Sequence, residues 1–244
     1  MIEMIALGLL VGTLSGFFGI GGGTILVPAL LLLTYDIKVA VGISIVQMVF
    51  SSIFGTLLNS KKGTLDYKMT SFIGVGGFLG ALFSATITQH LSEKFLEIIF
   101  LSFVVFALIR VFTTLSVETH KRDVAPFYLL VIGFFIGIFS MTIGVGGSIL
   151  LVPILVGFFH IPLKNATSAG LFFVVFSSLS GLISHLLDGS IDYTTGITIG
   201  IASLFGVYLG INLKEYVSAK LHKMLLTLFY FTLVVYLSQR VLLG

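Results

Sequence analysis

The sequence of 244 residues contains no cysteine, no tryptophan and only four prolines, and charged residues make up just 9% of it. The absence of cysteine excludes a disulfide framework, a thiolate metal site and a cysteine nucleophile. A soluble domain carries about 25% charged residues, so this scarcity of charge excludes an ordinary water-facing globule. The composition also excludes a disordered chain, because such a chain combines low hydrophobicity with high charge.

Long apolar stretches take the place of charge. Hydrophobic residues make up 57% of the chain, and several windows of about 20 residues, long enough to cross a hydrocarbon core of about 30 Å, contain no charged residue. The sequence therefore predicts an all-α polytopic protein that lies in the lipid bilayer of the cell membrane. The net charge of +3 is too small to indicate nucleic-acid binding. We expect no nucleic-acid partner, no cofactor and no metal, and the start of the chain lacks the basic region of a signal peptide.

The chain is an internal duplication. Residues 19–28 recur as residues 144–153 at an offset of 125, and the match continues at an offset of 126 as far as Lys94, which meets Lys220. A register held over almost a whole half is not expected by chance, even between apolar segments. We predict two homologous repeats joined by a polar linker, with the first repeat over 1–117, the linker over 118–124 and the second repeat over 125–244.

Each repeat divides into four apolar segments, and the first of them is interrupted by glycines. The segments cover about 2–33, 39–58, 69–89 and 95–115, and then about 126–159, 166–187, 193–213 and 221–241. An opening segment of about 33 residues is too long for one crossing and too short for two, which need about 40. Glycines inside a continuous helix would cost about 1 kcal/mol each. Each repeat is therefore predicted to open with a glycine-broken re-entrant or discontinuous helix pair.

The placement of lysine and arginine favours the re-entrant arrangement. If all eight segments cross the membrane, 7 of these residues fall on one side and 6 on the other. If the first segment of each repeat is re-entrant, the distribution becomes 10 against 3, which follows the positive-inside rule. Each repeat then crosses three times, so the second repeat is predicted to be inverted and both termini lie outside. Inverted repeats are a recurring plan of secondary transporters.

The two glycine clusters are the main candidate binding elements, and we call them the first and second glycine elbows. The first consists of Gly21, Gly22 and Gly23, and the second of Gly146, Gly147 and Ser148. The half-helix that follows each elbow points its unpaired N–H groups and its positive dipole end into the membrane. Glycines let an anion approach these groups, and the hydroxyl of Thr24 or Ser148 adds a cap or a donor. The alternative is that the glycines serve only close helix packing, but their duplication favours a substrate site.

Neutral polar side chains on the next helix of each repeat are further candidates for substrate binding. Ser44, Gln47 and Ser51 share one helix face through their i, i+3, i+7 spacing. The matching segment of the second repeat contributes Ser168 and Ser178. An interhelical hydrogen bond worth about 0.6 kcal/mol would explain each serine equally well. Gln47 lies midway along its segment and is difficult to explain as a lipid-facing residue.

Two roles are open for His185, which has Asp188 about one turn further on. A buried histidine can take up a proton, and protons are then the candidate coupling ion for transport. The alternative is a histidine at the membrane interface with no part in transport.

The duplicated Gly-x-Gly-Gly-(Gly/Ser)-x4-Pro motif, with the segments 40–44 and 166–168 that follow it, resembles the TauE/SafE family of sulfite exporters over essentially the whole chain. The resemblance implies a secondary transporter of the prokaryotic inner or plasma membrane that exports small sulfur-containing anions such as sulfite or organosulfonates. Members of the family differ in substrate, so the resemblance leaves the individual anion open. Carried over to this chain, the motif residues are Gly19, Gly21, Gly22, Gly23 and Pro28, and Gly144, Gly146, Gly147 and Pro153, with Ser148 in place of the third glycine.

Other classes of function fit the sequence less well. An enzyme is not expected, because there is no Gly-x-Ser-x-Gly elbow and acidic residues such as Asp36 and Asp66 lie in connectors. An ATP-driven pump is disfavoured because the sequence has no phosphate-binding loop. We expect transport by alternating access between the two repeats. The alternative is a passive anion channel of the same fold, and the oligomeric state stays open.

Overall fold

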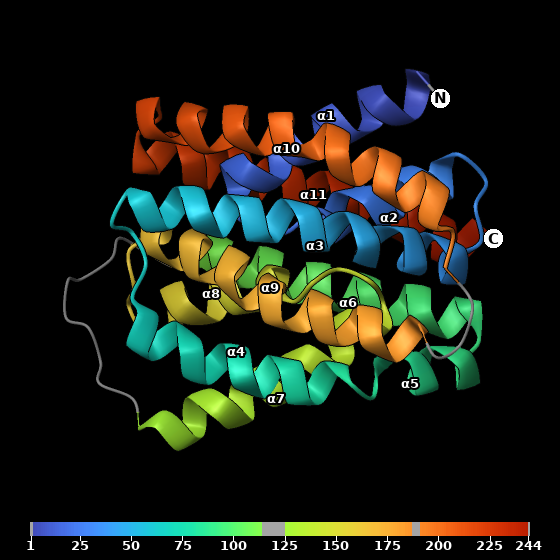
Figure 1. The fold of residues 1–244 in the computed structure, drawn as a ribbon, viewed down its shortest axis with the longest axis horizontal. Coiled ribbons are helices and arrows are strands. Elements are labelled where there is room, and N and C mark those ends of the chain that lie inside the picture. The colour runs from blue at the N-terminus through green and yellow to red at the C-terminus, as the bar shows by residue number, and fades with distance from the viewer. Residues whose placement is uncertain (1, 114–124, 187–190, 244) are drawn as a thin grey trace.

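The computed structural model describes residues 2–113, 125–186 and 191–243, which form eleven α-helices and no strand (Figure 1). In chain order the helices are α1 (Ile2–Phe18), α2 (Gly23–Leu32), α3 (Ile37–Lys61), α4 (Tyr67–Ala81), α5 (Ser84–His90), α6 (Glu93–Thr113), α7 (Pro126–Thr142), α8 (Ser148–Gly157), α9 (Leu163–Leu186), α10 (Tyr193–Tyr216) and α11 (Ala219–Leu243). Five of them are long and apolar enough to cross a membrane, and the bent pair α4 and α5 makes a sixth candidate span. The predicted all-α fold is confirmed, whereas the predicted linker over 118–124 lies outside the described residues.

The corresponding helices of the two repeats match one to one, with one exception. The third apolar segment of the first repeat is split into α4 and α5, which meet at an angle of 42°, whereas α10 is continuous. At the break the hydroxyl of Ser184 in α9 donates to the carbonyl of Leu82 (2.8 Å) and accepts from the N–H of Ala85 (3.2 Å). A side chain that inserts into the helical ladder is a known cause of kinks. The position equivalent to Ser184 in the first repeat is Leu58, which cannot do this to α10.

The two repeats interlock instead of lying side by side. α1 packs along α10, and α4 packs along α7. Small residues let the backbones touch in both pairs: a Cβ added to Gly12 would overlap the backbone of Ser203, and one added to Gly80 would overlap that of Phe134. This close approach is typical of helix packing in membranes. The first helix of each repeat therefore docks on the other repeat.

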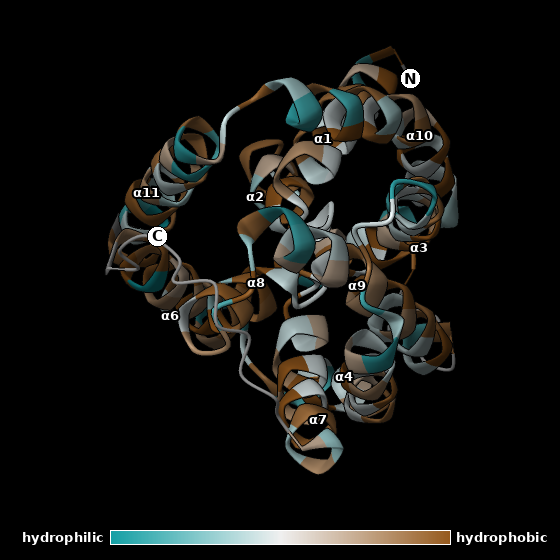
Figure 2. Cartoon of the chain, turned by 90° about the vertical axis from the view of Figure 1, so that its left-hand side faces the viewer, coloured by the Kyte–Doolittle hydropathy of each residue, from teal (hydrophilic) through white to brown (hydrophobic). Residues whose placement is uncertain are grey.

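α3 and α9 occupy the centre of the molecule. Figure 2 looks along the helices and shows α3 and α9 between the α1/α10 pair and the α4/α7 pair, with α6 and α11 to one side. In an apolar stretch of 18 residues, 67% of the residues of α3 and of α9 are buried, compared with 33% for α6 and 22% for α11. The two central helices therefore carry the residues most shielded from the surroundings.

Corresponding helices run in opposite directions. In Figure 1, α3 runs from right to left and α9 from left to right. Contacts agree with this, since Thr64, just beyond the end of α3, bonds to Ser168 near the start of α9 (2.8 Å between the hydroxyls). α1 begins and α2 ends at the right of Figure 1, while α7 begins and α8 ends at the left. Each opening pair is therefore a hairpin whose turn, a glycine elbow, lies in the interior.

Candidate functional site

The backbone at the two elbows adopts conformations that favour glycine. Gly21 has a φ of 75°, Gly146 of 77° and Gly147 of 86°, all in the left-handed region that side chains disfavour. These residues reverse the chain between the two helices of each hairpin. Gly22 differs, because its φ of −65° is an ordinary helical value. What Gly22 provides is space: a Cβ at this position would overlap the side-chain amide of Gln47.

The two elbows lie against each other at the centre of the molecule. The hydroxyl of Thr24 donates to the carbonyl of Val145 (3.3 Å), and that of Ser44 donates to the carbonyl of Gly144 (2.8 Å). From the second repeat, Ser177 donates to the carbonyl of Gly146 (3.0 Å). All three hydroxyl side chains are fully buried. The carbonyls before and within the second elbow are thus satisfied by hydroxyl groups of both repeats.

Unsatisfied polar groups gather at the first elbow. Gln47 is 0% exposed, and neither its Oε1 nor its Nε2 has a hydrogen-bond partner among the described residues. The hydroxyl of Ser148 is likewise buried and unpartnered within the described chain, and it faces Gly21, whose added Cβ would lie 3.3 Å from the Ser148 Oγ. A buried polar group without a partner costs about 1–3 kcal/mol. Such groups call for an explanation, and a ligand that they bind is one.

The start of α2 adds two backbone donors to this site. Its first backbone hydrogen bonds run from the N–H groups of Ile25 and Leu26 to the carbonyl of Gly22. The N–H groups of Gly23 and Thr24 precede these bonds and are the ones a helix leaves for a ligand. Together with the Gln47 amide and the Ser148 hydroxyl, they form a set of neutral donors suited to an oxyanion.

The second elbow is not an equivalent site. Phe173 holds the position that corresponds to Gln47, and its ring packs against Gly147. Gly170 holds the position that corresponds to Ser44. The sequence led us to treat the two elbows as equal partners. The start of α8 repeats the backbone pattern, since its first bonds run from Leu150 and Leu151 to the carbonyl of Gly147, but among the described residues only the first elbow has a buried side-chain amide beside it. The second elbow contributes Ser148 and the packing surface.

The structure brings together most of the predicted site residues, although whether they bind an anion stays a prediction. Grouped at the centre are Gly21, Gly22, Gly23, Thr24, Ser44, Gln47, Gly146, Gly147 and Ser148.

The remaining predicted residues do not join this group. Ser51 and Ser178 each bond to a carbonyl of their own helix, at 3.4 Å in both cases. Ser168 lies near the start of α9, where it donates to the carbonyl of Lys164. His185 is 3% exposed and lies near the opposite end of α9. The adjacent Asp188 lies outside the described residues.

Three residues at the elbows were not predicted from the sequence. Ser177 binds the second elbow, and the Met48 and Val174 side chains pack against Gly146. Ser177 corresponds to Ser51 at the offset of 126, so the repeat register would have identified it. Ser178, the serine predicted from the sequence, is the next residue of α9 and bonds to Val175 within its own helix.

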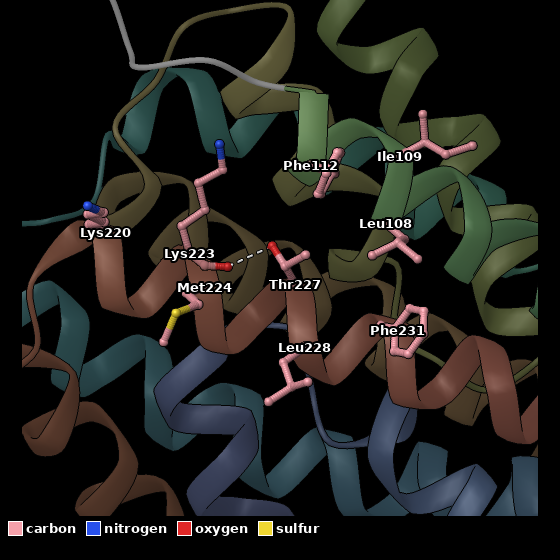
Figure 3. Close-up of a pocket in the computed structure, with 9 residues that line it drawn as sticks. All are labelled: Leu108, Ile109, Phe112, Lys220, Lys223, Met224, Thr227, Leu228 and Phe231. Atoms are coloured by element: carbon pink, nitrogen blue, oxygen red, sulfur yellow. Dashed lines mark hydrogen bonds between the residues drawn. The ribbon is translucent and has the colours of Figure 1, made fainter.

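A groove of about 850 Å³ lies elsewhere, between α6 and α11 (Figure 3). Its lining is mostly apolar, and Phe112 and Leu228 in it are 72% and 60% exposed. Figure 3 shows the hydroxyl of Thr227 bonded to the backbone carbonyl of Lys223, with the two lysines of the groove at one end. Such a lining on the outer face suits lipid chains better than a small anion, so we place the candidate site at the first elbow.

Comparison with known proteins relates the chain to membrane transporters. The family model described as "Sulfite exporter TauE/SafE" matches residues 4–237. The chain is 27% identical to the probable membrane transporter protein YunE of Bacillus subtilis, over 89% of each chain. It is 26% identical to the probable membrane transporter protein MJ0441 of Methanocaldococcus jannaschii, over 89% of this chain and 87% of that protein. No solved structure matches the chain.

Proposed function

The chain belongs to the sulfite exporter TauE/SafE family, and from that membership we propose that it is a secondary transporter that exports small sulfur-containing anions, such as sulfite or organosulfonates, across the cell membrane. Its relatives are named as membrane transporters, and its apolar helices make it a multi-pass membrane protein. Transport, and not catalysis, is the activity that these relatives share by name.

The observation that carries this proposal is the buried side-chain amide of Gln47 in α3, which lies against Gly22 before α2 and has no hydrogen-bond partner among the described residues. An oxyanion at the first elbow would accept hydrogen bonds from Gln47 Nε2, from the Ser148 hydroxyl and from the N–H groups of Gly23 and Thr24. All of these donors are neutral. They hold an anion by hydrogen bonds and by the helix dipole, which lets it leave again more readily than a salt bridge with a lysine would.

We propose alternating access as the mechanism, with the two repeats inverted in the membrane and both termini outside. The opposite directions of α3 and α9 support the inverted arrangement (Figure 1). Thr24, Gln47 and Ser148 are all 0% exposed, so an anion reaches them only when the helices around the elbows move. This requirement favours a carrier over the alternative, a passive anion channel of the same fold. Protons, with His185 as acceptor, are the candidate coupling ion.

The test is uptake into proteoliposomes of labelled sulfite, thiosulfate, a sulfonate, sulfate and chloride, each with and without a proton gradient. Saturable uptake of one class of sulfur oxyanion is expected, and its dependence on the gradient tests proton coupling. Fast, non-saturating passage of several anions, chloride included, would establish the channel instead. Absence of uptake for every sulfur anion would overturn the proposed substrate class.

A further inference from the structure

A buried lysine lies close to the first elbow. Lys214 in α10 is 3% exposed, and its Nζ is 3.4 Å from Asn59 Oδ1 and 3.5 Å from Thr167 Oγ1. These are long contacts for an ammonium group, which has three donors to satisfy. Within the described part of the chain, Lys214 forms no ion pair with a carboxylate. Its direct hydrogen-bond partners are therefore two neutral oxygens.

The nearest acid in the sequence is already engaged by other lysines. Glu215 pairs with Lys164 at 2.5 Å and with Lys62 at 3.7 Å. Lys164 and Lys62 thus share the Glu215 carboxylate, and Lys214, which precedes Glu215 in the chain, has no ion pair of its own among the described residues. An ionisable group buried in a membrane bundle is costly and typically marks a substrate or ion pathway.

A second unsatisfied group adjoins Lys214. Asn59 is 0% exposed, and its Nδ2 has no hydrogen-bond partner among the described residues. Its Oδ1 faces the ammonium group of Lys214. The cluster therefore offers one buried cation and one buried amide donor, and its unmet requirement is an acceptor with negative charge.

The cluster is adjacent to the first elbow through Thr167. A Cβ added to Gly19 would lie 2.6 Å from the carbonyl oxygen of Thr167, so the residue that bonds Lys214 also touches the turn before the elbow. Lys214 lies near the end of α10, at the end of the molecule where α3 also finishes and α9 begins, the end seen in Figure 2. The charge distribution of the sequence assigns this end to the cytoplasm.

Among the described residues, the other end of the molecule has no such cluster. The position equivalent to Lys214 is Thr88, whose hydroxyl is satisfied by the carbonyl of Thr142 (2.8 Å). The positions equivalent to Asn59 and Thr167 are His185 and Val41. In the described part of the chain, the buried lysine with its amide neighbour therefore lies at one end of the molecule only.

We propose that Lys214 and Asn59 form a second anion-binding site, which takes the small sulfur oxyanion between the cytoplasmic end and the first elbow. The identity of the anion rests on the proposed function. The two sites have different roles. The ammonium group of Lys214 attracts the anion and removes its water near the cytoplasmic end. The neutral donors of the elbow then bind the anion at the centre, from where it is released. A fixed cation in a narrow path raises the local concentration of an anion and its rate of capture.

The test is the KM for labelled sulfite measured separately from each face, in right-side-out and inside-out vesicles. Lys214→Gln is expected to raise KM by about tenfold or more at the cytoplasmic face, the size expected for a lost charge-assisted hydrogen bond, with KM at the other face unchanged. Lys214→Arg keeps the positive charge and is expected to retain the low KM of the wild type. Lys68→Gln, which removes an exposed charge at the same end, is the matched control and leaves both values unchanged. Equal losses of rate at both faces with unchanged KM would overturn the proposal and make Lys214 a structural residue.

Asn59→Asp provides a variant whose folding is not at risk from an isolated charge, because the new carboxylate pairs with Lys214. It is expected to raise KM at the cytoplasmic face as Lys214→Gln does, and an unchanged KM would contradict the site. A binding measurement separates this proposal from the proposed function. If the wild type transports no sulfur anion, sulfite titrated into the purified protein decides the matter: a rise in melting temperature that Lys214→Gln abolishes and Gln47→Leu retains supports the site, and no rise in the wild type overturns it.

Discussion

Individual residues at the elbows are small or polar for different physical reasons. Gly21, Gly146 and Gly147 have positive φ angles, so their backbone requires glycine. Gly22 has a helical φ, and its missing side chain matters only because the Gln47 amide fills the space. Gln47 in turn lacks a partner within the described residues although it is fully buried. We therefore expect the pair formed by Gly22 and Gln47 to contribute to transport more than to stability.

Gln47→Leu separates stability from transport. Leucine fills a similar volume and removes two unsatisfied polar atoms, so the free energy of unfolding should be unchanged or higher by up to about 3 kcal/mol. Uptake of sulfite should fall by about tenfold or more, because the lost donor faces the anion. Melting temperature and proteoliposome uptake measure the two effects. Ser52→Ala removes another buried, unpartnered hydroxyl of α3 and should leave uptake unchanged; a Gln47→Leu protein that is less stable but fully active would contradict the site.

Alanine substitutions at the two elbows should have different effects. In Gly22→Ala the backbone is unstrained and only the flexible Gln47 side chain must move, so the protein should keep its melting temperature but transport poorly. In Gly147→Ala the left-handed backbone costs about 1–2 kcal/mol, and the new Cβ meets Phe173, so the melting temperature should fall. The two variants are compared by thermal unfolding and uptake on the same preparations. If Gly22→Ala transports as well as the wild type, the position of Gln47 is not critical.

Sequence reasoning selected the elbow and Gln47 as candidates but gave no reason to select Lys214. The glycine pattern and a glutamine in the middle of an apolar segment are visible without a structure. Lys214 lies near the end of an apolar segment, where a lysine normally extends to the membrane surface. Its burial results from Asn59 and Thr167 on two other helices, and the sequence contains no signal for that contact.

Contacts between distant segments also limit what the sequence predicts about whole helices. The duplication predicted the matching helices and the hairpins at the elbows. It did not predict the break between α4 and α5, because the cause is Ser184 on α9, about one hundred residues further along the chain, and not a local helix breaker. A substitution in one repeat can thus bend a helix of the other, which a comparison of the two repeats alone does not reveal.

The start of α10 offers a test of helix capping outside the apolar span. Asp192 accepts hydrogen bonds from the N–H (3.0 Å) and the hydroxyl (2.6 Å) of Thr195, and the hydroxyl bond is the main reason why its pKa lies below the ordinary value. Asp192→Ala should therefore lower the free energy of unfolding by about 1 kcal/mol at neutral pH.

The contribution of Asp192 to the free energy of unfolding should also depend on pH. Because the pKa in the folded protein is depressed, the charge stabilises the fold above the unfolded pKa of about 4 and stops doing so as the pH falls through the lower folded value. The melting temperatures of the wild type and Asp192→Asn, which can still accept the Thr195 N–H bond, should converge as the pH falls through this range. A difference that stays constant from pH 7 to pH 3 would contradict the interpretation.

For the molecule as a whole, the arrangement in the membrane can be mapped with single cysteines, since the natural chain has none. Lys94, Lys68 and Lys220 are exposed residues at helix ends. With inverted repeats, a membrane-impermeant maleimide should label Lys94→Cys in intact cells, and should label Lys68→Cys and Lys220→Cys only after permeabilisation. An arrangement with eight crossings places Lys220 on the same side as Lys94, so labelling of both in intact cells would exclude the proposed topology.

The docking of α1 on α10 also affects how the protein is made. Synthesis proceeds from the N-terminus at about 5–20 residues per second, so on the order of ten seconds pass between the synthesis of α1 and the synthesis of α10. During that time the face around Gly12, which touches the α10 backbone in the finished protein, borders lipid or the insertion machinery. α4 waits in the same way for α7. A ribosome that stopped after the first repeat would release a half-protein with two uncovered docking faces, one on α1 and one on α4.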